Sequence, residues 1–130
     1  MDWTELAHHA WEARNHAYAP YSQFKVGAAL QTKSGAIFVG CNVENLSFGL
    51  TNCAERVAIG NAIASGQREF EQIVVVADTE KPISPCGACR QVLAEFGVQR
   101  IVLIGKHGSE EFTLEQLLPR ASTGILDRES

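Results

Sequence analysis

Apolar and small residues recur every three or four positions in several stretches of the chain, which is the period of helices with one buried face. The first stretch runs from Asp2 to about Tyr18 and stops before Pro20, because a residue that precedes proline disfavours helical geometry. Two further helices are predicted from Cys53 to Ala64 and from Gly87 to Phe96, each followed within two residues by a glycine that can end it. A short fourth helix is predicted around Thr113 to Leu118.

Four other runs are rich in β-branched and apolar residues and predict strands. Lys25 to Thr32 and Ala36 to Val43 are joined by a turn signal at residues 33–35, so we expect them to pair as an antiparallel hairpin. Ile73 to Ala77 and Ile101 to Ile104 are short, apolar and uninterrupted, as in strands that are buried on both faces. Strands and helices of this kind together predict an α/β fold.

The length of 130 residues fits one compact domain, residues 1–130, and is too short for two ordinary domains. We expect the mostly polar end, residues 122–130, to be partly disordered. The formal net charge of −4 provides no basic field for phosphates. This charge argues against a nucleic-acid polymer as partner and favours a small ligand.

No run approaches the roughly 20 apolar residues that a membrane helix needs, so we expect no membrane partner. The first residues, MDWTELAHHA, lack the basic and then apolar order of a signal peptide, and we therefore expect a cytoplasmic protein. Because the cytoplasm is reducing, the four cysteines are better explained as metal ligands, catalytic groups or buried thiols than as disulfides.

Three of the cysteines have the spacing of metal ligands. Cys86 and Cys89 lie three positions apart at the start of a predicted helix, where their sulfurs point to one side and can share a tetrahedral zinc ion. Cys53 begins another helix and would supply the third sulfur, and helix N-termini favour the thiolate that zinc binds. Three protein ligands leave a fourth position for water, which is the pattern of a catalytic zinc. We predict one Zn²⁺ per chain.

Two charged residues follow Cys53 closely in its helix. Glu55 can reach a water on the zinc without binding the metal itself, which would make it the proton shuttle of a hydrolytic reaction. Arg56 can donate hydrogen bonds to the cysteine sulfurs, and so offset the net negative charge that three thiolates give to zinc.

The same residues also have less specific explanations. Cys41 would be the fourth ligand of a closed structural zinc, but such sites typically use two close ligand pairs, and its place in an apolar strand fits a buried thiol better. A single glutamate in a first helical turn is most often a solvated charge, and only its position beside Cys53 favours a catalytic role for Glu55. The four histidines fit surface or satisfied polar roles.

Four motifs resemble those of the small cytidine deaminases, and the resemblance extends over roughly residues 2–119. In chain order they are YAPYS with FKVGAA, taken together as one motif within residues 18–29, then GCNVEN at 40–45, CAER at 53–56 and SPCGACRQ at 84–91. Zinc nucleobase deaminases carry an H-x-E and P-C-x-x-C signature, which this chain resembles with cysteine in place of the histidine.

The resemblance implies a three-layer cytidine deaminase-like α/β fold, with a mixed five-stranded sheet and helices on both faces. It also implies zinc bound by the same three cysteines, and a homotetramer in which neighbouring subunits complete each active site. For a nucleoside substrate it implies that Phe24 packs on the nucleoside, that Asn42 and Glu44 hydrogen-bond the ribose hydroxyls, and that the Ala54 backbone meets the pyrimidine carbonyl. Asn42 and Glu44 would point to one face of a strand end, which fits a shared ligand and equally fits ordinary solvated residues.

Two positions depart from the family pattern. Many members continue Leu-Leu-Pro with Gly-Ala-Phe, and that Phe stacks on the base in a neighbouring subunit, whereas here Pro119 is followed by Arg120, Ala121 and Ser122. Base–aromatic stacking contributes about 1–3 kcal/mol, so the missing ring bears on the substrate range. Phe48 stands where a Tyr is common, which removes a hydroxyl group.

These observations predict hydrolytic deamination of cytidine, and also of 2′-deoxycytidine, to uridine and ammonia in pyrimidine salvage. One alternative is the same chemistry on a related aminopyrimidine nucleoside such as blasticidin S, although the set of Phe24, Asn42 and Glu44 favours an ordinary ribose. A second is a non-catalytic interaction module stabilised by a zinc with four protein ligands. A third is editing of a polynucleotide, against which the acidic charge argues. The preference between ribose and deoxyribose stays open.

Overall fold

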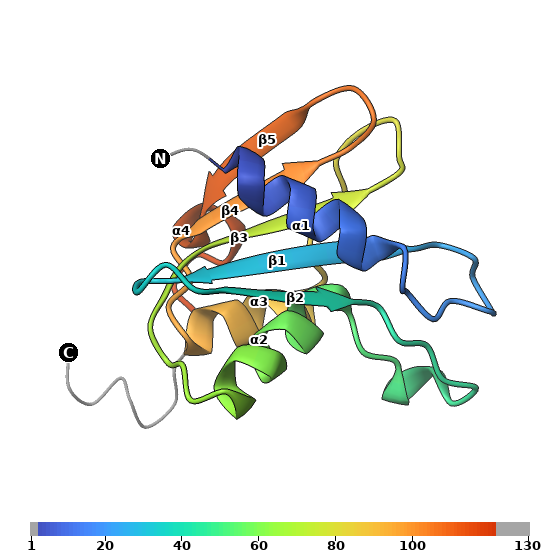
Figure 1. Cartoon of the computed structure of the whole chain (residues 1–130), viewed down its shortest axis with the longest axis horizontal. Helices are drawn as coiled ribbons and strands as arrows, with labels where there is room; N and C mark the ends of the chain where they lie inside the picture. Colours follow the sequence, from blue (N-terminus) through green and yellow to red (C-terminus); the bar gives the residue numbers. More distant parts are fainter. Residues whose placement is uncertain (1–2, 122–130) are drawn as a thin grey trace.

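The computed structural model describes residues 3–121, and a five-stranded sheet lies at its centre (Figure 1). The sheet has the strand order β2-β1-β3-β4-β5. β3 and β4 run parallel, and the other neighbouring pairs are antiparallel. The sheet is therefore mixed, which confirms the fold that the family resemblance implied. The strands are β1 Val26–Thr32, β2 Ile37–Cys41, β3 Phe70–Ala77, β4 Arg100–Ile104 and β5 Ser109–Thr113.

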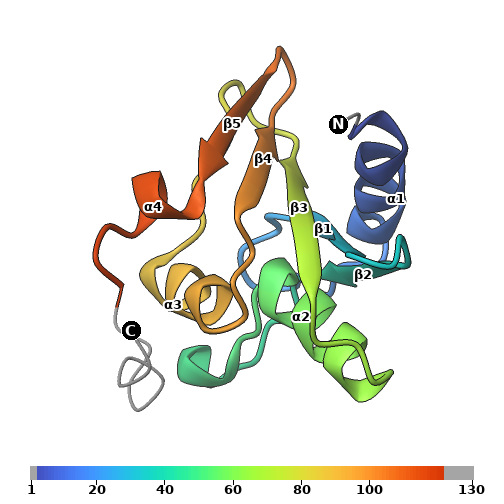
Figure 2. The same cartoon turned by 90° about the vertical axis from the view of Figure 1, so that its left-hand side faces the viewer.

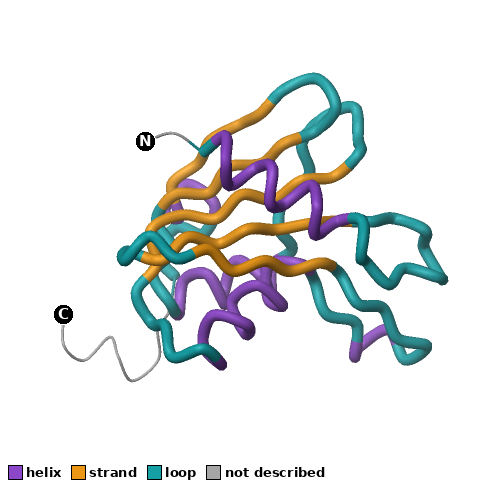
Figure 3. Tube along the Cα trace, in the orientation of Figure 1, coloured by secondary structure: helices purple, strands orange, loops and turns teal. Residues whose placement is uncertain are grey.

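Helices cover both faces of this sheet, which gives the three layers that the resemblance implied. Figure 2 shows α1 on one face and α2 and α3 on the other, and Figure 3 shows the strands as the layer between them. A short α4 follows β5 and packs beside α3. The helices are α1 Thr4–Arg14, α2 Ala54–Ala64, α3 Gly87–Glu95 and α4 Leu114–Leu117, with a 3₁₀ turn, η1, at Phe48–Leu50.

The central position of β3 in the sheet explains why residues 73–77 form an uninterrupted apolar run. Val74 belongs to the core under α1, together with Leu6 and Ala10 of that helix. Ile73 belongs to the core on the opposite face, together with Leu93 of α3. Alternate side chains of one strand thus enter two cores, so every position from 73 to 77 must be apolar.

Two glycines let helices approach strands more closely than any side chain would allow. A Cβ atom on Gly27 of β1 would lie 2.1 Å from the carbonyl oxygen of Ala10 in α1. A Cβ atom on Gly40 of β2 would lie 2.4 Å from the carbonyl oxygen of Ala54. The second contact brings the first turn of α2 against the end of β2, where Asn42 follows.

The first helix is shorter than predicted. It ends at Arg14 and not near Tyr18, because Tyr18 is extended and pairs with Val43. The backbone N–H of Tyr18 donates to the Asn42 carbonyl at 3.0 Å, and its carbonyl accepts from the N–H of Glu44 at 2.9 Å. This pairing between distant segments overrides the local helical pattern, and it attaches residues 18–22 to the strand end at which candidate site residues lie.

The sheet contains two stretches that the apolar pattern did not predict as strand. β3 begins at Phe70, before Ile73, and contains the fully buried Gln72, whose Nε2 donates to Oε1 of Gln31 on β1 at 2.9 Å. The edge strand β5 was not predicted, because its residues are mostly polar and exposed. Pairing with β4 places it in the sheet.

No helix within residues 3–121 is long and apolar enough to span a membrane. The disorder expected for residues 122–130 concerns positions outside the described residues.

Candidate metal centre and active site

Three cysteine sulfurs converge where the N-termini of α2 and α3 meet. Cys53 is the N-cap residue of α2, Cys86 is the N-cap residue of α3, and Cys89 lies in the first turn of α3. Their Sγ atoms all lie within 4.8 Å of one another. Among residues 3–121 this is the only group of three or more potential ligands of this kind, and Cys41 is not part of it. The closed structural site with Cys41 as fourth ligand is therefore wrong.

The spacing of the sulfurs fits a tetrahedral zinc ion. Sulfurs bound at about 2.3 Å from a tetrahedral centre lie about 3.8 Å from one another. The Sγ of Cys86 is 3.9 Å from that of Cys53 and 3.4 Å from that of Cys89, so only small movements are needed. The Sγ of Cys86 also accepts a hydrogen bond from the backbone N–H of Cys89 at 3.4 Å, which orients it. Three thiols are a soft donor set of the type that zinc binds.

Arg56 lies against one of the three sulfurs. Its Nη2 donates to the Sγ of Cys53 and to the carbonyl of Thr51, both at 3.4 Å. The pKa of the Cys53 thiol is lowered to about 5, first by the hydrogen bond from Cys89 and further by Arg56. The pKa of Cys89 is raised in turn, because it donates that hydrogen bond and because it is buried. The cluster thus favours a thiolate at Cys53, the form in which cysteine binds zinc.

The carboxyl group of Glu55 is buried in the first turn of α2, and the residue is only 4% exposed. Burial is the main reason that its pKa is raised to about 7, and the negative charge of Cys53 also raises it. A carboxyl group with a pKa near neutrality can both accept and release protons at physiological pH, as general acid–base catalysis requires. The explanation of Glu55 as a solvated surface charge is therefore wrong.

A cavity of about 210 Å³ lies beside the sulfurs and the buried carboxyl group. Its wall contains two of the three clustered cysteines and also residues predicted to contact substrate. A nucleoside base in this cavity would therefore lie against both the metal ligands and the predicted substrate contacts. The lining residues from the sequence-based predictions are Phe24, Asn42, Cys53, Ala54, Glu55 and Cys86.

Hydrogen bonds hold Asn42 and Phe24 to each other at the start of β1. The Oδ1 of Asn42 accepts from the N–H of Val26 at 2.9 Å, and its Nδ2 donates to the Phe24 carbonyl at 2.8 Å. Asn42 is buried, so the explanation of it as a solvated strand end is wrong. Phe24 is 40% exposed, so its ring is not part of the core and is accessible from the cavity.

Glu44 lies in an adjoining cavity of about 340 Å³ that shares Thr51 with the first. Its carboxylate accepts hydrogen bonds from the N–H of Tyr21 at 3.0 Å, from the N–H of Ser22 at 3.2 Å and from the Ser22 hydroxyl. The Ser22 hydroxyl is the main cause of the lowered pKa of Glu44. Glu44 is thus separated from the cavity that holds the other predicted substrate contacts, and it orders the segment that follows Pro20.

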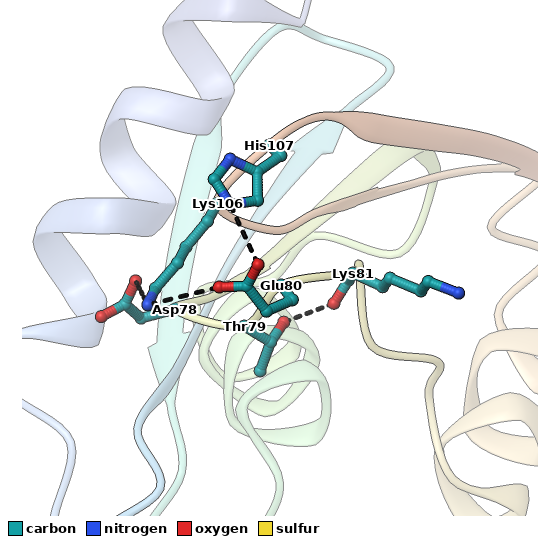
Figure 4. Close-up of polar contacts among 6 residues, drawn as sticks. All are labelled: Asp78, Thr79, Glu80, Lys81, Lys106 and His107. Atoms are coloured by element: carbon teal, nitrogen blue, oxygen red, sulfur yellow. Dashed lines mark hydrogen bonds and ion pairs between the residues drawn. The ribbon is translucent and has the colours of Figure 1, made fainter.

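The loop between β3 and α3, residues 78–86, is braced by the turn between β4 and β5, residues 105–108. The backbone N–H of Lys106 donates to the Thr79 carbonyl at 2.7 Å, and the Nζ of Lys106 lies 3.8 Å from the Glu80 carboxylate. Exposed ion pairs of this kind stabilise weakly, so the backbone contact positions the loop more than the charges do. Figure 4 shows the side chains of this contact, in which Lys106 lies near Asp78 and Glu80, and the ring of His107 lies 3.1 Å from the Glu80 carboxylate.

The brace depends on close packing at Gly105. A Cβ atom there would lie 2.8 Å from the Thr79 carbonyl oxygen and 2.9 Å from the backbone nitrogen of Pro82. The loop that passes over this glycine then supplies Ile83 and Ser84 to the cavity wall and ends at Cys86.

The family model for the cytidine and deoxycytidylate deaminase zinc-binding region matches residues 1–105 of the chain. This range contains the three cysteines of the cluster and all the residues that line the cavity. The chain belongs to the cytidine and deoxycytidylate deaminase family. The family that the motifs resembled is thereby confirmed, and a zinc ion held by the cysteine cluster is its cofactor.

Known deaminases resemble this family member over most of its length. A cytidine deaminase from Sporosarcina psychrophila is 51% identical over 124 residues, which are 93% of this chain and 91% of that protein. The crystal structure of cytidine deaminase from Burkholderia pseudomallei matches with a TM-score of 0.90 at 51% identity, over 94% of this chain and 100% of that chain. A blasticidin-S deaminase from Bacillus cereus is 36% identical over 103 residues, which are 72% of this chain and 74% of that protein.

Four residues that line the cavity of this deaminase were not among the predicted site residues, namely Val26, Thr51, Ile83 and Ser84. The sequence does offer a signal for Ser84, which lies only two residues before Cys86. Thr51 had no such signal, because its place follows from the folding of its loop. Its hydroxyl accepts from the N–H of Asn45 at 3.1 Å, which folds the segment between β2 and α2 back toward the cavity.

Proposed function

We propose that this family member is a zinc-dependent hydrolase that deaminates cytidine, and also 2′-deoxycytidine, to uridine and ammonia. The observation that carries the proposal is the buried carboxyl group of Glu55 in one cavity with Cys53 and Cys86. A catalytic zinc needs a neighbouring group that moves protons, whereas a structural zinc does not. The likeness over most of the chain to proteins named as cytidine deaminases supports the choice of substrate.

Each member of the cluster has a chemical role in this proposal. When bound by the three cysteines, zinc supplies a Lewis acid that makes water reactive enough to attack C4 of the pyrimidine. Glu55 accepts a proton from the attacking water and delivers it to N3 of the base. Glu55 then carries the second proton to the 4-amino group, which leaves as ammonia. Arg56 keeps Cys53 in its thiolate form and offsets the negative charge of the sulfurs.

The remaining residues hold the nucleoside. Phe24 packs on it from the exposed side of the cavity, and the backbone of Ala54 meets the pyrimidine carbonyl. We assign the second N–H of the Asn42 amide to a ribose hydroxyl, because its Oδ1 and its other N–H are engaged by backbone groups. Glu44 reaches the ribose from the adjoining cavity, where its carboxylate is already oriented by three hydrogen bonds.

A homotetramer in the cytoplasm, acting in pyrimidine salvage, is the setting that we propose for this reaction. Leu46, Phe48 and Leu50 are 78%, 76% and 65% exposed, and the η1 segment projects beyond the sheet (Figure 1). Exposed apolar side chains that lie close together in this way support a contact with another subunit, and Phe48 places that contact beside the cavity that contains Glu44. Light scattering should give the mass of four chains. A fully active monomer would contradict the shared active site.

Blasticidin S or a similar aminopyrimidine nucleoside is the second candidate substrate. It is favoured by the sequence after Pro119, where Arg120 and Ala121 stand in place of the segment that brings a stacking Phe in many family members. The test is kcat/KM of zinc-loaded protein on cytidine, 2′-deoxycytidine and blasticidin S under one set of conditions. We expect cytidine to give the highest value, and a higher value for blasticidin S would replace the first proposal with the second.

A further inference from the structure

Arg90 connects the segment that carries Cys86 to the C-terminal part of the fold. It lies in α3, directly after Cys89. Its Nε donates to the carbonyl of Pro85 at 2.9 Å, and its Nη1 donates to the carbonyl of Leu117 at 2.6 Å. Pro85 immediately precedes Cys86, and Leu117 is the last residue of α4. One side chain therefore joins the peptide next to a zinc ligand to the end of a distant helix.

The two acceptors are carbonyl groups that helical hydrogen bonding does not satisfy. Pro85 lies before the first residue of α3, and Leu117 ends a helix of four residues whose last carbonyls have no following turn. Pro85 is buried and Arg90 is half-buried, so these hydrogen bonds are partly shielded from water. The planar guanidinium group presents several N–H donors in fixed directions, so it can satisfy both carbonyls at once.

The far end of this bridge is itself held in place. The Thr113 hydroxyl accepts from the N–H of Gln116 at 3.2 Å, and the Gln116 side chain accepts from the N–H of Thr113 at 2.8 Å, which caps the start of α4. The side chains of Leu114 and Leu117 are buried in the core on the α2–α3 face. The Leu117 carbonyl is thus a fixed point, from which Arg90 can hold the Pro85 peptide.

Of the three zinc ligands, Cys86 is the least buried, and it is the one that follows the Pro85 peptide held by Arg90. Cys89 is buried and Cys53 is half-buried, whereas Cys86 is exposed. Packing therefore fixes Cys89 but contributes little to the position of Cys86. The Sγ of Cys86 must nevertheless stay close enough to the other two sulfurs for one zinc ion to bind all three.

We propose that Arg90 is a positioning residue, which keeps Cys86 in the geometry for zinc by bridging the Pro85 and Leu117 carbonyls. This inference rests on the proposed zinc site and adds to it the dependence of zinc affinity on the C-terminal helix α4. Arg90 does not touch the metal or the substrate in this account, and it acts through the backbone of the loop that ends at Cys86.

The test compares zinc affinities measured by chelator competition on the full chain. Arg90→Gln removes both the charge and the bridge, and Arg90→Lys keeps the charge but lacks the planar set of donors. We expect both variants to bind zinc roughly tenfold or more weakly than wild type, as for other groups that orient metal ligands, with an unchanged far-ultraviolet circular dichroism spectrum. The matched control is Arg68→Gln, an exposed arginine between α2 and β3, which should bind zinc like wild type.

A second variant tests the connection to α4. Thr113→Ala removes the cap of α4 and should weaken zinc binding in the wild-type background, but it should add nothing in the Arg90→Lys background. Additive losses would overturn coupling through Arg90. Unchanged zinc affinity of Arg90→Lys, including the case in which only its melting temperature falls, would overturn the bridge. A wild-type chain that binds no zinc would overturn both this inference and the proposed function, whereas zinc binding that ignores Arg90 would overturn the inference alone.

Discussion

Replacement of Glu55 by glutamine separates proton transfer from every other property of the site. The side chain is 4% exposed and glutamine has nearly the same size, so Glu55→Gln leaves no cavity in the packing of α2. Glutamine cannot accept and return a proton, so a general acid–base contribution of roughly 10²–10⁴ in rate should be lost. At about 1.4 kcal/mol per factor of ten, this is roughly 3–5 kcal/mol of transition-state stabilisation. Zinc content should not change, because the zinc ligands are the three clustered cysteines and Glu55 is not among them.

The assay follows the loss of cytidine absorbance, with zinc content and melting temperature measured on the same preparations. Glu95→Gln is the matched control, because Glu95 is exposed at the far end of α3, and its kcat should equal that of wild type. A zinc-loaded Glu55→Gln that kept kcat within roughly a factor of ten of wild type would show that Glu55 is not the proton shuttle.

Three further variants test the surroundings of the site. Arg56→Gln removes a donor 3.4 Å from a ligand sulfur, so zinc affinity by chelator competition and kcat should both fall, by about 10–100-fold. Ser22→Ala should raise the pKa of Glu44 toward its ordinary value, as read from a carboxyl NMR titration, because the Ser22 hydroxyl is the main cause of its lowering. Since that pKa is lowered in the folded chain, the contacts of ionised Glu44 weaken as pH falls, and in the variant they should weaken at a higher pH. Gly105→Ala should lower the free energy of unfolding by about 1–3 kcal/mol, because its Cβ would lie 2.8 Å from a backbone oxygen, whereas Gly108→Ala, with nothing within 4 Å, should leave the urea midpoint unchanged.

Each of these outcomes can fail separately. Normal zinc affinity and turnover in Arg56→Gln would remove its proposed role beside Cys53. An unchanged pKa of Glu44 in Ser22→Ala would mean that backbone N–H groups alone hold the carboxylate. Equal urea midpoints for the Gly105 and Gly108 variants would show that the β4–β5 turn does not pack tightly on the loop before Cys86.

Buried helices and strands with a strong pattern of apolar residues were predictable from the sequence. Elements whose position depends on pairing with a distant segment were not. The run Ile73 to Ala77 identified a strand buried on both faces, because a central strand must offer apolar side chains to two cores. The edge strand β5 is mostly exposed and polar, so local hydrophobicity carried no signal for it, and the fifth strand came only from the family resemblance. The early end of α1 likewise follows from the pairing of Tyr18 with Val43, a contact that no local pattern contains.

The same distinction holds for the candidate site. The pairing of Cys86 and Cys89 could be predicted from their spacing at a helix start, which is a local feature. The convergence of Cys53 with them was expected only from its own place at a helix start and from the metal chemistry, because the contact joins two helices distant in the sequence. The separation of Glu44 into an adjoining cavity could not be predicted, since it depends on how the segment of Ser22 folds back on the strand end. The hydrogen bond from Arg90 to a residue of α4 also joins distant segments, so the motif that contains Arg90 gave no indication of it.

Removing and restoring zinc would show whether metal held by Cys53, Cys86 and Cys89 makes this chain a cytidine deaminase. Purified wild-type protein would be depleted with a chelator and reloaded with Zn²⁺, while cytidine absorbance, ammonia and bound metal are measured together. We expect one zinc per chain, with uridine and ammonia formed from cytidine only when zinc is bound. Full activity of the depleted protein, or zinc-loaded protein that releases no ammonia from cytidine, would contradict this expectation.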